Sequence, residues 1–122
     1  MLDRTIETRR FVTPDEHLDM KERGGTSIIR MKGGSAGMQA VFEPGWTWEV
    51  DETPLLGSPE SCPMRHKGYY MSGELVVRML ETCAETRLRP GDFFEIPPGH
   101  DAYVAGDERV ELILFESAEH QH

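Results

Sequence analysis

Short runs of apolar residues, broken every few positions by glycine or proline, make up most of the chain. Nine of these runs have the length of β-strands, and turn-forming residues separate them at intervals of about eight to twelve positions. The predicted strands cover residues 26–31, 38–42, 46–50, 69–71, 75–80, 83–88, 92–96, 102–105 and 109–115. The pattern favours a β-barrel or β-sandwich over a helix bundle.

Three places in this pattern allow more specific predictions. Residues 32–37 are rich in glycine and predict a hairpin between the first two strands. Residues 72–74 predict a second, tight hairpin. In residues 46–50, Trp46, Trp48 and Val50 alternate with polar side chains, which predicts a half-buried strand with both indoles facing the interior.

The N-terminal segment has a different pattern. Residues 1–13 show no period, and we expect them to form an arm on the outside of the barrel or on a partner. Thr13, Pro14 and Glu16 match the cap, first turn and capping box of a helix, so a short helix is predicted to follow. The glycine pair at 24–25 would end it.

The last predicted strand is apolar on both faces. Val110, Leu112 and Leu114 lie on one face, whereas Ile113 and Phe115 lie on the other. Apolar groups on both faces require cover on both sides, either from the N-terminal arm or from a second subunit. We therefore expect a homodimer.

The chain length and charge narrow the function. A chain of 122 residues suits one domain, which we divide into an arm with the first strands (1–39), a barrel core (40–116) and a tail (117–122). The net charge of −9 (13 − 22) argues against nucleic acid and anionic membranes as partners. No run of about 20 apolar residues and no signal peptide is present, so a cytoplasmic protein is expected. In that compartment Cys62 and Cys83 are expected as free or metal-bound thiols.

Residues of the kinds that bind metals gather in two segments. The first is the run Glu-Ser-Cys-Pro-Met-Arg-His at 60–66, which leads to Gly73. The second begins with a Gly-Asp turn at 91–92 and a short apolar strand, and continues through a Pro-Pro-Gly corner at 97–99 to His100.

Together these segments resemble the two motifs of the cupin superfamily. Gly91, Pro97 and Gly99 match the second motif without a gap, but its histidine position falls on Ala102. His100 stands two residues earlier, and in an extended segment positions 100 and 102 share a face. The asparagine position of that motif falls on a glycine.

The first motif is altered as well. Counted back from Gly73, its glutamate position falls on His66, and its two histidine positions fall on Glu60 and Cys62. The resemblance, which covers roughly residues 40–116, implies a small single-domain cupin with a permuted metal motif. It implies an all-β jelly-roll barrel, also called a double-stranded β-helix.

The resemblance also implies a site. Cys62, His66 and His100, with Glu60 as a further candidate, would hold a divalent transition metal, with zinc expected ahead of iron because a thiolate and imidazoles form a borderline-soft ligand set. Three protein ligands would leave a position for water or substrate. Four aromatic residues are candidates for the wall of a ligand pocket, namely Trp46, Trp48, Tyr70 and Tyr103.

The sequence leaves three functions open. The first is a metalloenzyme that acts on a small molecule in the barrel, the second a non-enzymatic module that senses a small ligand or a metal. In the third, a structural zinc would fix the proline-rich loop 55–63 to the barrel. The chain has no nucleophile elbow, phosphate-binding glycine loop or dinucleotide fingerprint, which removes those enzyme classes.

Overall fold

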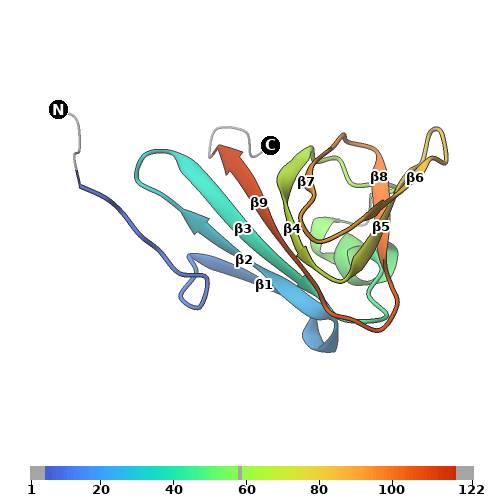
Figure 1. Cartoon of the computed structure of the whole chain (residues 1–122), viewed down its shortest axis with the longest axis horizontal. Coiled ribbons are helices and arrows are strands. Elements are labelled where there is room, and N and C mark those ends of the chain that lie inside the picture. Colours follow the sequence, from blue (N-terminus) through green and yellow to red (C-terminus); the bar gives the residue numbers. More distant parts are fainter. Residues whose placement is uncertain (1–4, 58, 118–122) are drawn as a thin grey trace.

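The computed structural model describes residues 5–57 and 59–117, and within them nine strands form two antiparallel sheets (Figure 1). The larger sheet has the order β1-β2-β3-β9-β4-β7, and the smaller has the order β6-β5-β8. Their bounds are β1 Glu16–Asp19, β2 Gly24–Arg30, β3 Ser35–Phe42, β4 His66–Ser72, β5 Glu74–Met79, β6 Glu85–Leu88, β7 Phe93–Ile96, β8 His100–Ala105 and β9 Val110–Ser117. The predicted all-β jelly roll is confirmed. No helix in the described ranges is long and apolar enough to cross a membrane.

The two sheets enclose one core, because alternate side chains of each sheet point toward the other. Phe42, Tyr70 and Leu112 contribute from the larger sheet, and Leu75 and Val104 from the smaller one. Strand β9 lies between β3 and β4, which are far from it in the sequence. A Cβ atom at Gly68 would overlap the carbonyl oxygen of Ile113 and the ring of Phe94, so only glycine lets β4 approach β9 there.

The helix predicted after Thr13 is wrong. Residues Glu16–Asp19 form strand β1, which pairs with β2. The acidic residue Asp15, in the predicted first turn, bonds to β2 instead, since its backbone N–H donates to Ile28 O at 2.9 Å and its carboxylate accepts from Arg30 N at 2.7 Å. Only a short 3-10 turn, η1 at Lys21–Arg23, interrupts the strands here.

The strand predicted at 46–50 is also wrong. A single π-helical turn, η2, spans Trp48–Glu52, and a 3-10 turn, η3, follows at Thr53–Leu56. Thr47 caps η2, because its hydroxyl accepts from Val50 N at 3.1 Å while its own N–H donates to the Asp51 carboxylate at 3.0 Å. Both indoles are nevertheless buried, as the sequence predicts, with Trp48 only 3 % exposed.

The connection at residues 72–74 is not a hairpin, although the hairpin predicted between β2 and β3 is confirmed. Strand β4 pairs with β7 and β9, whereas β5 pairs with β6 and β8, so this turn carries the chain from one sheet to the other. Gly73 has a φ of 77° and lies against the Arg109 carbonyl and the Val110 side chain. Strand β9 therefore occupies the place beside β4 that a hairpin partner would take.

The N-terminal arm partly covers the outer face of the larger sheet. Phe11 lies over Gly37 of β3, the residue paired with Phe115 of β9. Phe115 itself remains 48 % exposed. The second subunit expected from the sequence stays a prediction.

The cap of η2 can be tested directly. Thr47→Ala removes the acceptor for Val50 N, and we expect the free energy of unfolding to fall by about 1 kcal/mol. Urea unfolding followed by tryptophan fluorescence measures this loss. Thr8→Ala, at an exposed position of the arm, is the control and should change stability by less than about 0.5 kcal/mol. An equal loss in both variants would contradict the capping role.

Candidate metal centre

A backbone bridge brings Cys62 and His100 together. Cys62 N donates to His100 O at 2.8 Å, and Gly99 N donates to Cys62 O at 2.8 Å, so the two residues pair as in an antiparallel ladder. Gly99, with a φ of 94°, completes the Pro-Pro-Gly corner that ends β7 and places His100 first in β8. His66 is the first residue of β4 and pairs with Ile96 of β7, beside the same corner.

The three side chains converge at one end of the barrel interior. One donor atom from each of Cys62, His66 and His100 lies within 4.8 Å of the other two. Cys62 Sγ is 3.6 Å from His66 Nε2, and the two imidazole centroids are 5.3 Å apart with their planes at 67°. Cys62 and His100 are only 1 % and 4 % exposed. The cluster is therefore shielded from bulk water.

A second contact orients one of the imidazoles. His100 Nδ1 lies 2.7 Å from the carbonyl oxygen of Pro97, which can only accept, so Nδ1 carries the proton and donates. Nε2 then keeps its lone pair for the cluster. Metal-binding histidines are commonly held in this way by a carbonyl on the other ring nitrogen.

The cluster also favours a thiolate. In the metal-free cluster, burial raises the pKa of Cys62, but hydrogen bonds from the protonated imidazoles of His100 and His66 lower it by more, and the pKa falls to about 6. The thiolate is the form of cysteine that binds metals. This acidity follows from the imidazoles, which stabilise the charged sulfur where burial alone would oppose it.

The donor set fits a transition metal. A thiolate and two imidazoles are typical zinc ligands, and in a tetrahedral site neighbouring donors lie roughly 3.3–3.6 Å apart, from bond lengths of about 2.0–2.3 Å. The 3.6 Å between Cys62 Sγ and His66 Nε2 matches this spacing. Three ligands from the protein leave a fourth position for water or substrate, as in catalytic zinc sites.

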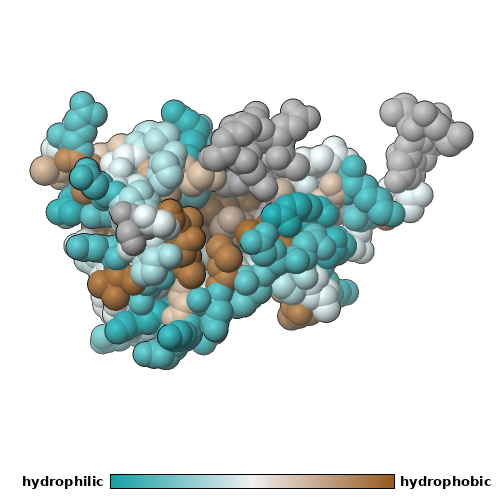
Figure 2. Space-filling model, turned by 180° about the vertical axis from the view of Figure 1, so that it is seen from behind, coloured by the Kyte–Doolittle hydropathy of each residue, from teal (hydrophilic) through white to brown (hydrophobic). Residues whose placement is uncertain are grey.

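The cluster opens into a cavity of about 190 Å³ between the two sheets. Among the described residues, eighteen of the twenty-two that line it (22 − 4) are apolar or aromatic, and the other four are Thr26, Glu52, His66 and His100. Seen from behind, the molecule shows hydrophobic residues gathered about a hollow, with hydrophilic ones around them (Figure 2). Leu55 and Leu56 of η3 line the cavity and are partly exposed. The site thus combines an apolar chamber with a polar end.

Comparison with known proteins identifies the fold. No family model matches the chain, and no curated protein resembles it in sequence. Among solved structures, the polyketide cyclase RemF from Streptomyces resistomycificus superposes with a TM-score of 0.66 at 9 % identity, over 97 % of this chain and 83 % of that one. A cupin-like protein from Thermotoga maritima superposes with a TM-score of 0.51 at 21 % identity, over 80 % of this chain and 71 % of that one. The chain has the cupin fold.

A third structure, FeII HppE, superposes with a TM-score of 0.63 at 11 % identity, over 95 % of this chain and 62 % of that one. Identities this low establish the fold alone, since one fold hosts many functions. The chemistry of this chain must therefore be argued from its own residues.

The structure places the predicted site residues in different surroundings. Cys62, His66 and His100 come together, whereas Glu60 is exposed and stands outside their cluster. Trp46 and Trp48 line the cavity. Two tyrosines lie elsewhere: Tyr70 is fully buried in the core, and Tyr103 of β8 is 39 % exposed beside Thr47.

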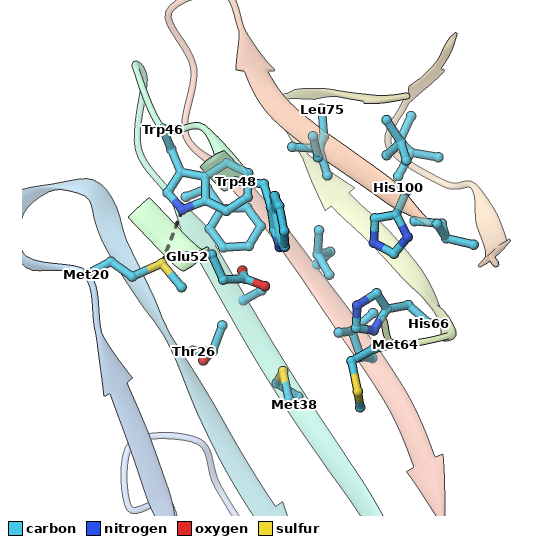
Figure 3. A pocket seen from close by; sticks show the side chains of 18 of the residues that line it. Met20, Thr26, Met38, Trp46, Trp48, Glu52, Met64, His66, Leu75 and His100 are labelled. Atoms are coloured by element: carbon cyan, nitrogen blue, oxygen red, sulfur yellow. Dashed lines mark hydrogen bonds between the residues drawn. The ribbon is translucent and has the colours of Figure 1, made fainter. Parts of the chain in front are cut away.

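Sequence reasoning missed Glu52, whose carboxylate points into the cavity from the side opposite His66 and His100 (Figure 3). A strand over 46–50 would have ended before it, whereas η2 places Glu52 one turn after Trp48. The sequence held only a local signal for this turn, because threonine is a preferred N-cap residue and Thr47 precedes η2, while Pro54 suits the start of η3. Burial and the nearby Cys62 raise the pKa of Glu52, the imidazoles and the Trp48 N–H lower it less, and the result is about 7.

The raised pKa of Glu52 predicts a pH-dependent stability. The folded protein holds this proton more tightly than the unfolded chain, so stability falls as pH rises from about 4.5 to 7. Glu52→Gln removes this titration. The free energy of unfolding of the variant minus that of the parent should therefore increase by up to about 3 kcal/mol from pH 4.5 to pH 8, because the pKa of Glu52 is raised from 4.5 to about 7 in the folded protein.

Urea unfolding of both proteins in the presence of a chelator, at either end of this pH range, measures the difference. Glu49→Gln is the matched control, because Glu49 lies on the same helical turn but is exposed. A stability difference between Glu52→Gln and the parent that does not vary with pH would contradict the assignment.

Proposed function

We propose that this cupin binds a divalent transition metal through Cys62, His66 and His100 and acts as a metalloenzyme on a small molecule in the adjoining cavity. The observation that carries the proposal is the convergence of three donor atoms within 4.8 Å at the end of an apolar chamber. Zinc is the proposed metal, because a thiolate with two imidazoles is a typical zinc ligand set, whereas iron oxygenases typically bind their iron through histidines and a harder carboxylate.

The metal would supply Lewis acidity and an acidified bound water. The chain supplies the rest of the site. His100, held by Pro97 O, presents a fixed lone pair, and the imidazoles keep Cys62 available as a thiolate. The apolar walls exclude bulk water, which strengthens electrostatic interactions at the polar end.

A non-enzymatic binding module is the second candidate. It is favoured by the departures from the four ligand positions of the common cupin motifs and by a cavity lined chiefly by apolar side chains. Both candidates bind a small molecule in the cavity or at its polar end, and a module that senses a small ligand does not need the metal. They differ in turnover, since the module would bind small molecules without converting them even when loaded with metal.

Metal analysis tests the metal site of the proposed metalloenzyme. Protein purified without an affinity tag and without added metal should contain about one zinc per chain, from the ligand count of the site. Cys62→Ser, His66→Ala and His100→Ala should each lose most of it, because removing one of three ligands lowers metal affinity by more than the roughly 10–100-fold expected for an outer-shell change.

Matched controls exist in the same chain. Cys83→Ser and His17→Ala change residues of the same types at exposed positions, and Glu60→Gln changes the exposed carboxylate of the first segment. All three should retain the parent's metal content. Stoichiometric metal in the Cys62 and His66 variants would overturn the site.

We also propose that the protein is a cytoplasmic homodimer. Cys62 and Cys83 are unpaired thiols, which suits a reducing compartment. The outer face of the larger sheet exposes three aromatic side chains on adjacent strands, namely Phe93, Tyr69 and Phe115.

Sedimentation equilibrium should therefore give about twice the chain mass of 13.9 kDa. Phe115→Asp should lower the measured mass to that of a monomer. Dimer formation would bury the new carboxylate without an opposite charge beside it, which is strongly unfavourable. Phe11 partly covers the same face within one chain, so Phe11→Ala is the comparison variant and should remain dimeric. A monomeric parent would contradict the proposal.

A further inference from the structure

The polar groups of the cavity lie at two separate places. His66 and His100 belong to the metal centre at one end. On the opposite side, Glu52 projects from η2 and Thr26 from β2 (Figure 3). Of the described residues that line the cavity, Glu52 alone has a carboxyl group.

Thr26 strengthens the evidence for a ligand at this second place. Its side chain is 5 % exposed, and its hydroxyl has no hydrogen-bond partner among the described residues. A buried hydroxyl without a partner destabilises the folded state, so such groups in proteins normally meet water or a bound molecule. Thr26 Oγ1 has less than 1 Å² of accessible surface, so its side chain must rotate to turn the hydroxyl toward the cavity that the residue lines. The Glu52 carboxylate already points into that cavity and marks where a polar group of a ligand would be received.

Glu52 does not serve as a fourth metal ligand here. The cluster of donor atoms within 4.8 Å contains Cys62, His66 and His100, and within the described part of the chain it does not include Glu52. The carboxylate faces the cluster across the cavity instead (Figure 3). The cavity of about 190 Å³ is lined by both Glu52 and the two imidazoles.

The walls between the two ends are aromatic and apolar. Phe42 and Trp46 stack with centroids 3.8 Å apart, and Trp46 is fixed by donation from Nε1 to Met20 Sδ at 3.1 Å. Trp48 stands beside Glu52 on η2. Such walls favour flat apolar molecules, and a carboxylate among them disfavours a second carboxylate.

We infer that the cavity takes a small, uncharged, largely aromatic molecule with a hydroxyl group, and that Glu52 determines this specificity by accepting a hydrogen bond from the hydroxyl. Thr26 completes the contact. The inference rests on the proposed function, because it names the substrate class of the same cavity. Its selectivity is a property of Glu52 and Thr26, however, and can be measured separately from metal binding.

The test uses three probes of one shape: 4-ethylphenol, ethylbenzene and 4-ethylbenzoate. Both tryptophans of the chain line the cavity, so quenching of their fluorescence reports its occupancy. At about pH 8, above the pKa of about 7 of Glu52, the purified protein should bind the phenol about tenfold more tightly than ethylbenzene, from one hydrogen bond to a charged group. The benzoate should bind most weakly.

Variants assign the preference to its residues. Glu52→Leu should lose most of the tenfold preference for the phenol over ethylbenzene and keep only the few-fold part that Thr26 supplies, because the charged acceptor is gone. Glu52→Gln keeps the shape of the side chain and should weaken the discrimination against the benzoate. Thr26→Val should lower the preference for the phenol by a few-fold, as expected for one neutral hydrogen bond of about 1 kcal/mol. Glu49→Leu, at the exposed position of η2, should leave all three affinities unchanged.

Two results would overturn the inference. One is a preference for the phenol that is as large in Glu52→Leu as in the parent, and the other is a parent protein that binds none of the probes or binds all three alike. Zinc is measured on the same samples. Loss of the preference in Glu52→Leu with parental zinc content supports the inference, whereas a parent that shows the preference but contains no metal overturns the proposed function alone.

Discussion

The antiparallel bridge between Cys62 and His100 is the contact on which the site depends. Its two backbone hydrogen bonds, each 2.8 Å long, join the irregular segment before β4 to the corner before β8. An irregular loop alone would not keep a thiol beside an imidazole, whereas backbone pairing fixes the two Cα atoms at the spacing of antiparallel strands. Because β4 begins four residues after Cys62, the same bridge brings His66 to the cluster. The geometry of the site is thus set by backbone pairing, and it forms only when the strands of the barrel are in place.

The apolar surroundings then act differently on two acidic groups. Burial raises the pKa of both Cys62 and Glu52, since a charge is less stable in a low dielectric. The imidazoles lie in hydrogen-bonding contact with Cys62 and outweigh burial there, so its pKa falls to about 6. They act on Glu52 only by electrostatic attraction without a hydrogen bond, so burial has the larger effect and the pKa of Glu52 rises to about 7. Proximity to the imidazoles, and not burial, therefore separates a stable thiolate from a carboxyl group that changes its charge near neutral pH.

Local patterns predicted the strands of the barrel better than its connections. Alternation and turn residues located eight of the nine observed strands, because side chains of a two-sheet fold must alternate between core and solvent. The missed strand, β1, has two acidic residues at its start, Asp15 just before it and Glu16 within it, that accept hydrogen bonds from Arg30 of β2. No capping pattern reveals this tertiary contact. The indoles of Trp46 and Trp48 gave a strand-like alternation within a segment that Thr47 and Asp51 turn into a helical one. Because a strand was predicted at 46–50, Glu52 was not recognised as a residue of the cavity. The cluster itself followed from motif spacing, whereas the exposure of Glu60 depends on how the loop folds around Cys62.

In this chain the histidine stands at position 100, two residues before the position that the common cupin motif gives it, and it still faces the barrel interior. A displacement of two residues along a strand preserves the face on which a side chain lies, and both His100 and Ala102 line the cavity. The imidazole moves one step along β8 toward the Pro-Pro-Gly corner, where the Pro97 carbonyl orients it and the bridge supplies Cys62 as its neighbour. The methyl group of Ala102 then stands where the common motif has a histidine. That exchange draws the polar groups together at the end of the barrel and extends the apolar wall behind them, so the cavity has a cluster of metal-ligand residue types at one end and a hydrophobic chamber beside it.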